Sequence, residues 1–193
     1  MSRPVELPWF GVDATGEPLT LRFGVRRDAT RYLEHLEQLV GETPFMLQGP
    51  EDPLPTVAEQ RDVIVEYTQR ANCVCIVAVR PGRPPGRQTI LGSVTLAGGR
   101  SRCLAHTAEL AMGVIHSEWR KGLGSLLLDA ALTWAEEAPT LVRVSLQVYA
   151  TNVAAKTLYE QRGFVQEGVL HGYAKWAGQY DDLVGMSIPV RHG

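Results

Sequence analysis

The chain has 193 residues, of which 45% are hydrophobic, and this is enough for one domain with a substantial core. Its 19 basic and 21 acidic residues give a formal net charge of −2, without the basic surplus that is typical of nucleic-acid-binding proteins. We therefore expect a single domain over residues 1–193, with a core from about 19 to 190 and no nucleic-acid partner.

Membrane, export and metal signals are weak in this sequence. The segment Met1–Glu6 has no apolar run of the signal-peptide type, and the longest uninterrupted apolar stretch, Val74–Val79, is too short to cross a membrane. Cys73, Cys75 and Cys103 do not have zinc-site spacing, and neither do the five histidines. The sequence favours a cytoplasmic protein without a membrane partner and without a metal.

Hydrophobic periodicity, together with the positions of Gly and Pro, predicts alternating strands and helices. The elements expected before residue 100 are a strand near Leu19–Val25, helices over Ala29–Val40 and Val57–Ala71, and strands over Val74–Val79 and Thr89–Leu96. We expect the last two strands to form a hairpin around the Pro- and Gly-rich stretch Pro81–Arg87.

The second half of the chain continues the alternation. The elements expected there are a strand ending at Val114, a helix to about Glu137, a strand near Val142–Tyr149, a short helix to Arg162, and strands around Gly163–Leu170 and Leu183–Val190. This order predicts an α/β fold in which helices flank a mixed, mostly antiparallel sheet.

The segment Trp119–Ser125 follows the strand that ends at Val114 and leads into an amphipathic helix. The first-turn N–H groups of a helix have no intrahelical partners, and the helix dipole adds positive charge there, so anions bind at such a position. Gly122 and Gly124 leave the main chain accessible to phosphate oxygens. Three neighbouring side chains add positive charge and a hydroxyl donor: Arg120, Lys121 and Ser125. We predict a pyrophosphate-binding site.

Two other phosphate-binding turns are disfavoured. A dinucleotide-binding turn has a third glycine, and Leu127 stands at that position. A nucleoside triphosphate P-loop has its lysine after the glycines, whereas Lys121 precedes Gly122. A turn with two glycines also occurs where they only reverse the chain, so the interpretation needs a second feature.

The second feature is the segment that follows the strand over Arg143–Tyr149. Asn152, Ala155 and Tyr159 are three and seven residues apart and so share one helical face. Asn152 is a favoured helix cap, and Gly163 suits a helix C-terminus. The alternative for Tyr159 is an aromatic side chain that only packs the helix on the sheet.

These segments, in this order, give the chain its resemblance to the GNAT N-acetyltransferase family, which extends from about Leu19 to Val190. The matching motifs are Met112-Gly113-Val114, Trp119-x-x-Gly122-x-Gly124, Asn152-x-x-Ala155-x-x-x-Tyr159 and Gly163-Phe164. The tail Gly178-x-Tyr180-x-Asp182-x-x-x-Met186, together with Glu42-Thr43-Pro44-Phe45, looks like a subgroup of that family that includes L-amino acid and other small-amine acetyltransferases. Trp119 is a departure, because the family usually has Gln or Arg there. The family's phosphate contacts come mostly from the main chain, so the resemblance still implies cofactor binding.

The resemblance implies direct transfer of an acetyl group from acetyl-CoA to the primary amine of a small molecule such as an amino acid. Tyr159 would donate the proton that the leaving sulfur needs, and the main chain of Met112–Val114 would pair with the pantetheine, with an N–H near Val114 polarising the thioester carbonyl. The implied cofactor-binding residues are Met112, Gly113, Val114, Trp119, Arg120, Lys121, Gly122, Leu123, Gly124, Ser125, Asn152, Ala155 and Tyr159.

The general base is open, because the family has no uniform one. Glu109, on the strand that leads to Val114, is the first candidate, and its alternative is an ordinary solvated strand residue. His106 and His116 are further candidates.

For the acceptor site the resemblance implies Phe45 and Tyr180, with Met46, Tyr173 and Trp176 as further lining candidates. A polyamine or a protein N-terminus stays open as the acceptor. Two further readings are a non-catalytic acetyl-CoA sensor and a nucleotide-phosphate binder, because a fold does not establish activity. We expect a homodimer on general grounds alone, since homodimers are the commonest oligomers.

Overall fold

A computed structural model of the chain describes residues 6–49, 51–81, 88–176 and 178–192. Eight strands form one sheet in the order β1-β2-β3-β4-β5-β6-β8-β7. The strands are β1 (Trp9–Val12), β2 (Pro18–Phe23), β3 (Val74–Pro81), β4 (Gln88–Gly98), β5 (Thr107–Val114), β6 (Arg143–Tyr149), β7 (Val165–Trp176) and β8 (Gln179–Pro189). The helices are α1 (Ala29–Glu42), α2 (Val57–Gln69), α3 (Leu123–Glu137) and α4 (Val153–Gln161), with short 3-10 turns η1 (Arg26–Asp28) and η2 (His116–Glu118).

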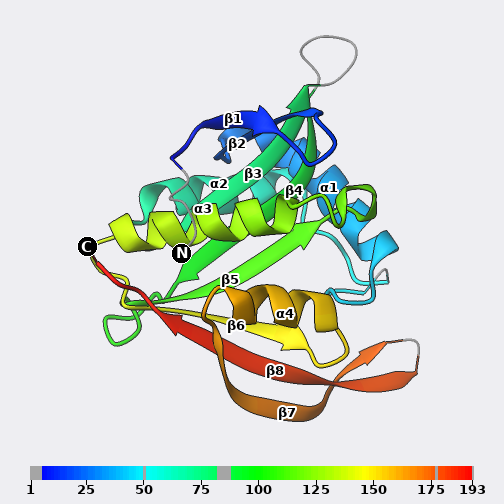
Figure 1. Cartoon of the computed structure of the whole chain (residues 1–193), viewed down its shortest axis with the longest axis vertical. Helices are drawn as coiled ribbons and strands as arrows, with labels where there is room; N and C mark the ends of the chain where they lie inside the picture. Colours follow the sequence, from blue (N-terminus) through cyan, green and yellow to red (C-terminus); the bar gives the residue numbers. More distant parts are fainter. Residues whose placement is uncertain (1–5, 50, 82–87, 177, 193) are drawn as a thin grey trace.

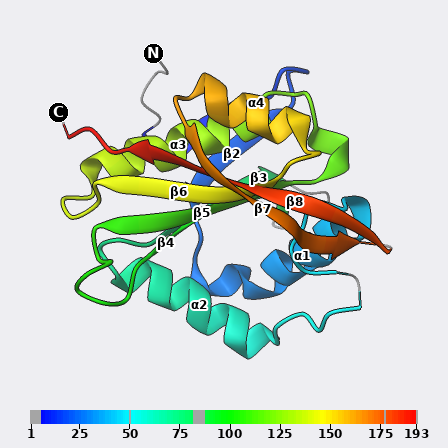
Figure 2. The same cartoon turned by 90° about the horizontal axis from the view of Figure 1, so that it is seen from below.

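The sheet separates two helical layers. Figure 2 shows α3 and α4 on one face and α1 and α2 on the other, with the strands between them. Close packing of α1 depends on Gly113 in β5, where an added Cβ would lie 2.4 Å from Leu39 Cδ1. On the opposite face, α3 buries Leu123, Leu127 and four further apolar residues against the sheet. The main hydrophobic core therefore lies around the central strands of the sheet, close to the point where β5 leads toward α3.

β5 and β6 pair over only part of their length. They are parallel, and their register covers Thr107 with Arg143 through Glu109 with Ser145. Beyond these pairs β6 continues to Tyr149 beside β8, while β5 continues to Val114 beside β4. Figure 1 shows the two strands diverging toward their C-terminal ends. The divergence frees one edge of β5 at the point where the chain turns toward α3.

Most of the predicted elements are present, and the fold class is confirmed as a mixed, mostly antiparallel sheet flanked by helices. β1 was not predicted; it is a short edge strand whose Phe10 and Val12 are exposed. The last two strands lie closer together in the chain than predicted, because β7 extends to Trp176 and β8 begins at Gln179. The predicted hairpin tip lies mostly outside the described residues. No helix in the described ranges is long and apolar enough to cross a membrane.

Candidate active site

The turn before α3 leaves the helix N-terminus open. Gly122, the residue before the helix, has φ +82° and provides no side-chain cap, while its carbonyl accepts from Leu126 N. Arg120 is also in the left-handed region, with φ +61°. The N–H groups of Leu123, Gly124 and Ser125 therefore begin the helix without an intrahelical partner. This is an anion-binding arrangement in which the backbone supplies the donors.

Gly122 is needed for its backbone angle and not for space, because nothing lies within 4 Å of an added Cβ. We expect Gly122→Ala to destabilise the fold by about 1–2 kcal/mol, the usual cost of a left-handed residue with a Cβ. Gly122→Asn should cost less, since Asn tolerates this region. Urea unfolding of both variants checks the order. Equal stability of Gly122→Ala and wild type would contradict it.

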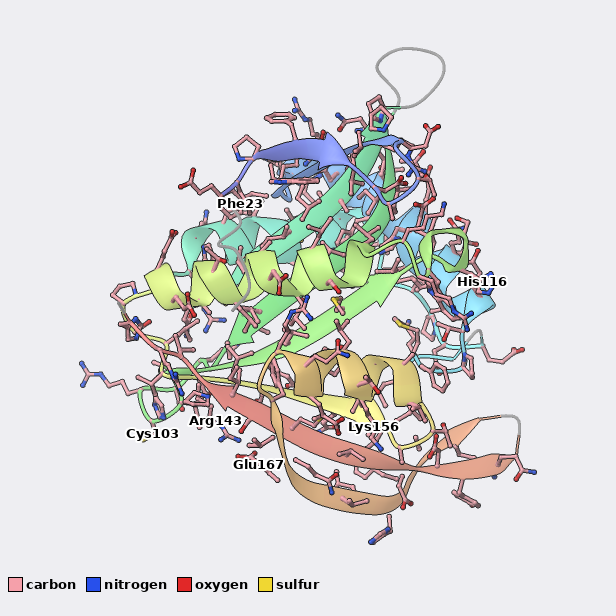
Figure 3. The ribbon with its side chains drawn as sticks, in the orientation of Figure 1. Phe23, Cys103, His116, Arg143, Lys156 and Glu167 are labelled. Carbon is pink, nitrogen blue, oxygen red and sulfur yellow. The ribbon has the colours of Figure 1, made fainter. Side chains whose placement is uncertain are left out.

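Trp119 ties the turn to the end of β5. Its Nε1 donates to the Val114 carbonyl oxygen at 2.7 Å, and its ring meets the edge of His116 with centroids 4.6 Å apart. Figure 3 shows His116 next to the chain that leaves β5. The indole therefore contributes a structural tether at a position where the sequence resemblance leads one to expect Gln or Arg.

Glu118, the last residue of η2, has a buried carboxylate beneath the turn. Its Oε1 and Oε2 accept from the two terminal nitrogens of Arg80 at 2.9 and 3.1 Å. Lys121 Nζ also donates to Oε1, at 3.3 Å. Lys121 is thus half-buried and already paired, whereas Arg120 is exposed. The two predicted cations of the turn have different environments.

The free edge of β5 presents the backbone of alternate residues. Ile115 N donates to Leu91 O, and Gly99 N donates to Thr107 O, so odd-numbered residues of β5 direct their backbone groups toward β4. Met112 and Val114 therefore direct theirs toward the side from which β6 has diverged. Since the Val114 carbonyl accepts from Trp119, the Met112 groups and the Val114 N–H remain for an added strand. The backbone N–H and carbonyl groups of Gly113 instead point toward β4.

Three elements converge at Gly124. A Cβ built there would lie 3.4 Å from Leu158 Cδ2 of α4 and 3.9 Å from Met112 Cε of β5. The open N-terminus of α3, the free edge of β5 and the helix that carries Tyr159 thus meet within a few ångströms. Asn152 caps α4 as predicted, because its Oδ1 accepts from Ala155 N at 3.2 Å.

Tyr159 lies in the core beside this convergence. Its side chain is 6% exposed and packs on Phe164, with ring centroids 5.6 Å apart. Burial raises the pKa of Tyr159 to about 12, so its phenol stays protonated at neutral pH. In this protonated form the phenol has a hydroxyl hydrogen to donate.

The sequence matches the Acetyltransferase (GNAT) family over residues 33–164, which is most of the chain. The chain belongs to the GNAT acetyltransferase family. It is 34% identical over 71 residues to the [Ribosomal protein bS18]-alanine N-acetyltransferase of Salmonella typhimurium. That match covers 37% of this chain and 47% of the relative, so the chain spans about half the length of this curated relative.

Solved structures show the same fold. A GNAT acetyltransferase from Streptococcus pneumoniae is 27% identical with a TM-score of 0.83, and the match covers 90% of this chain and 99% of that one. A phosphinothricin acetyltransferase from Sinorhizobium meliloti, solved with acetyl-CoA, is 19% identical with a TM-score of 0.75, covering 89% and 88%. The second likeness shows the fold alone.

The two acceptor-site candidates of this GNAT chain lie in one pocket at the diverging end of β6. Phe45 lies between α1 and α2, and Tyr180 is the second residue of β8 and is 69% exposed. The pocket has a volume of about 240 Å³ and is lined by Pro44, Phe45, Tyr149, Thr151, Gln179, Tyr180 and Asp181. Tyr149 packs its ring against Phe45 at 5.9 Å and donates its hydroxyl to Met46 O. Met46 and Tyr173 are absent from the lining, and the side chain of Trp176 lies outside the described residues.

Glu109 lies on the other side of the GNAT sheet from Tyr159. It shares its strand face with Gly113, which points at α1, whereas Tyr159 belongs to α4 on the opposite face. The Glu109 side chain is exposed and sits at the last paired position of β5 with β6. Glu109 and Tyr159 could therefore act in the same reaction only if the reacting groups lie in the space between the diverged strands β5 and β6.

The ion pairs of Arg80 with Asp13 and Glu118, next to this GNAT turn, were not predicted from the sequence. Arg80 comes from the end of β3, and Asp13 comes from the turn between β1 and β2, far from the motif in sequence. Glu118 stands next to Trp119, but nothing in a lone charged residue indicates burial. The one available signal was a charged residue at the end of an otherwise apolar run, Arg80 after Val74–Val79.

Proposed function

We propose that this GNAT protein is an acetyl-CoA-dependent N-acetyltransferase that acts on the primary amine of a small molecule such as an amino acid. The observation that carries the proposal is the convergence at Gly124 of an uncapped helix N-terminus, a free strand edge and the helix that bears Tyr159. Acetyl-CoA has groups that complement these three features. Its pyrophosphate needs backbone N–H donors, its extended pantetheine can pair like a strand, and its sulfur needs a hydrogen-bond or proton donor.

The residues of the turn and of β5 would bind the cofactor. Backbone N–H groups of Leu123, Gly124 and Ser125 would hold the pyrophosphate, and the Met112 groups would pair with the pantetheine. The Val114 N–H would polarise the thioester carbonyl as its oxygen gains charge. Arg120, Lys121 and Trp119 would frame the phosphates, with Asn152 and Ala155 at the start of α4. The remaining proposed cofactor contacts are Gly113, which lies between Met112 and Val114 in β5, and Gly122, whose left-handed backbone shapes the turn.

Tyr159 would assist departure of the thiolate. The amine nitrogen bonds to the carbonyl carbon, the carbon–sulfur bond breaks, and the sulfur leaves with the electron pair. A phenol whose pKa is about 12 would donate a hydrogen bond to that sulfur, whereas full proton transfer is uphill to a thiolate whose thiol has a pKa of about 8.5. Tyr159 therefore stabilises the leaving group mainly by hydrogen bonding until a proton arrives from the attacking amine.

Glu109 would accept the amine proton, directly or through water, from the α1 face of the sheet. Its exposed carboxylate makes it accessible to the solvent on that face. His116 is the runner-up, because its backbone N is held by Glu42 Oε2 at 2.7 Å near the end of β5. His106 lies at the far end of β5, before Thr107, and so farther from Val114.

The pocket between Phe45 and Tyr180 would hold the acceptor. Aromatic rings and the Asp181 carboxylate suit an ammonium group. A protein N-terminus is a second candidate, favoured by the likeness to the [Ribosomal protein bS18]-alanine N-acetyltransferase and by the exposure of Tyr180 at the pocket.

A panel of acceptors tests the proposal. The protein is incubated with acetyl-CoA and with free amino acids, polyamines or short N-terminal peptides, and free CoA is quantified by chromatography. Chromatography is preferable to a thiol reagent, because Cys103 is exposed and would react. Acceptor-dependent CoA release with amino acids supports the proposal. Release only with peptides or polyamines transfers the assignment to that class, and binding without release on any acceptor supports a sensor.

Phe45→Ala and Tyr180→Ala should each raise the KM for the acceptor, by about tenfold, while leaving the KM for acetyl-CoA unchanged. The reason is that each removes one aromatic wall of the pocket, and stacking or cation–π contacts of this kind are worth on the order of 1 kcal/mol or more. Steady-state kinetics with each substrate varied in turn measures both constants. Tyr173→Ala, an exposed tyrosine of β7 that does not line the pocket, is the control.

A further inference from the structure

An ion-pair network with two buried carboxylates connects the N-terminal hairpin with the turn before α3. Asp13 Oδ2 accepts from Arg80 Nη2 at 2.5 Å, and the same guanidinium donates to both carboxylate oxygens of Glu118. Asp13 is itself fixed, because its Oδ1 accepts from Thr15 N, Thr15 Oγ1 and Glu17 N. Asp13 and Glu118 are 6% and 4% exposed. The three side chains form one ion-pair array, in which the two carboxylates are buried and the Arg80 side chain is 23% exposed.

The array ends directly at the proposed phosphate site. Glu118 precedes Trp119, whose indole is tethered to β5, and it also pairs with Lys121. Arg120 lies between Trp119 and Lys121, and its backbone is in the left-handed region, with φ +61°. A backbone angle of this kind costs energy for a residue with a Cβ and persists only where its surroundings fix it. The turn is therefore fixed from below through Glu118.

The ion pairs of this array also determine whether the Lys121 ammonium is available to bind a phosphate. The four groups Asp13, Arg80, Glu118 and Lys121 are two carboxylates and two cations within one network. Without Arg80, Glu118 would be a buried carboxylate with Lys121 as its remaining ion-pair partner, and moving Lys121 away would leave that carboxylate uncompensated. With Arg80 in place, the Lys121 ammonium can turn to an anion above the turn at small cost.

We propose that Arg80, acting through Glu118, is a positioning residue for pyrophosphate binding: it fixes the turn over 119–122 and frees Lys121 for the phosphates. This inference rests on the proposed function and adds to it residues that contact no cofactor atom. It also gives the β1–β2 hairpin, which lies outside the family match over residues 33–164, a part in cofactor affinity.

Two substitutions test the proposal in the full-length protein. Arg80→Met removes the fork and the charge. Arg80→Lys keeps the charge, so the buried carboxylates stay compensated, but an ammonium cannot bind both carboxylates in the bidentate manner of a guanidinium. Arg80→Met should raise the Kd for acetyl-CoA about tenfold, and Arg80→Lys should raise it by a smaller factor in the same direction. If Arg80→Met does not fold, Arg80→Lys carries the test.

A cofactor without the pyrophosphate separates positioning from general loss of structure. The kcat/KM measured with acetyl-pantetheine should be the same for wild type and both variants, while that measured with acetyl-CoA falls. A matched control is Arg143→Met, because Arg143 forms a similar pair with Glu167 at the sheet surface, away from the turn (Figure 3). This variant should bind acetyl-CoA like wild type.

The outcomes are distinct. Unchanged acetyl-CoA affinity in folded Arg80 variants, or equal losses with acetyl-CoA and acetyl-pantetheine, would overturn the positioning role while leaving the proposed function intact. Failure of the wild-type protein to bind acetyl-CoA would overturn the proposed function and this inference with it. A double-mutant cycle adds a stricter check: Lys121→Met should weaken binding in wild type and have little further effect in the Arg80→Met background.

Discussion

Tyr159→Phe is expected to lower kcat by about 100-fold or more and to leave the Kd for acetyl-CoA nearly unchanged. Loss of one hydrogen-bond donor to charge that develops in the transition state costs a factor of about this size, and the substitution removes only the hydroxyl. The phenylalanine ring keeps its packing on Phe164, so the fold and the cofactor site should persist. Single-turnover kinetics and calorimetric titration measure the two constants separately.

The pH dependence sharpens this prediction. Because burial raises the pKa of Tyr159 to about 12, the phenol stays protonated over the pH range in which the amine and its base titrate. The ascending limb of the rate against pH should therefore be the same in Tyr159→Phe, with only its height reduced. Tyr67→Phe, on α2 across the sheet, is the matched control and should retain full activity. An unchanged kcat in Tyr159→Phe would remove the role assigned to this residue.

Ser125→Asp should abolish measurable acetyl-CoA binding while it maintains or increases thermal stability. Ser125 is the third residue of α3, where a carboxylate interacts favourably with the helix dipole by about 0.3–1 kcal/mol. The same carboxylate would lie beside the bound pyrophosphate. Two charges about 4 Å apart repel by about 4 kcal/mol near a protein surface, which corresponds to an affinity loss of more than about 100-fold.

Ser125→Asn provides the control for Ser125→Asp, because it has nearly the same size without the charge. It should bind acetyl-CoA within a few-fold of wild type. Thermal denaturation with and without acetyl-CoA gives both readouts for the two variants. A Ser125→Asp protein that is stabilised by acetyl-CoA as strongly as wild type would place the pyrophosphate elsewhere.

Local sequence signals predicted the parts of this site that lie close together in the chain. Gly122 and Gly124 followed a strand and preceded an apolar helical face, and the turn and α3 have the predicted arrangement. Asn152 had the residue type and spacing of a cap, and it caps α4. Gly163 follows that helix with φ +91°, as expected of a glycine at a helix end. Each of these features depends on neighbours within one or two turns.

The parts that could not be predicted depend on contacts between distant segments. The early end of the β5–β6 register, which frees Met112, is decided by the packing of whole strands, and the sequence of β5 does not contain it. The capture of the Val114 carbonyl by Trp119 depends on the path of η2. The Arg80 array joins β3 with the turn between β1 and β2, and β1 itself had a pattern too short to read as a strand.

Calorimetric titration of acetyl-CoA into the wild-type protein, with ATP as a competing ligand, tests whether this chain has a specific site for the cofactor. We expect saturable binding, a rise in melting temperature that grows with acetyl-CoA concentration by mass action, and no displacement by ATP at comparable concentration. Displacement by ATP with equal affinity would indicate a general nucleotide-phosphate site. If saturating acetyl-CoA gave neither a heat of binding nor a thermal shift, the proposed cofactor site would be contradicted.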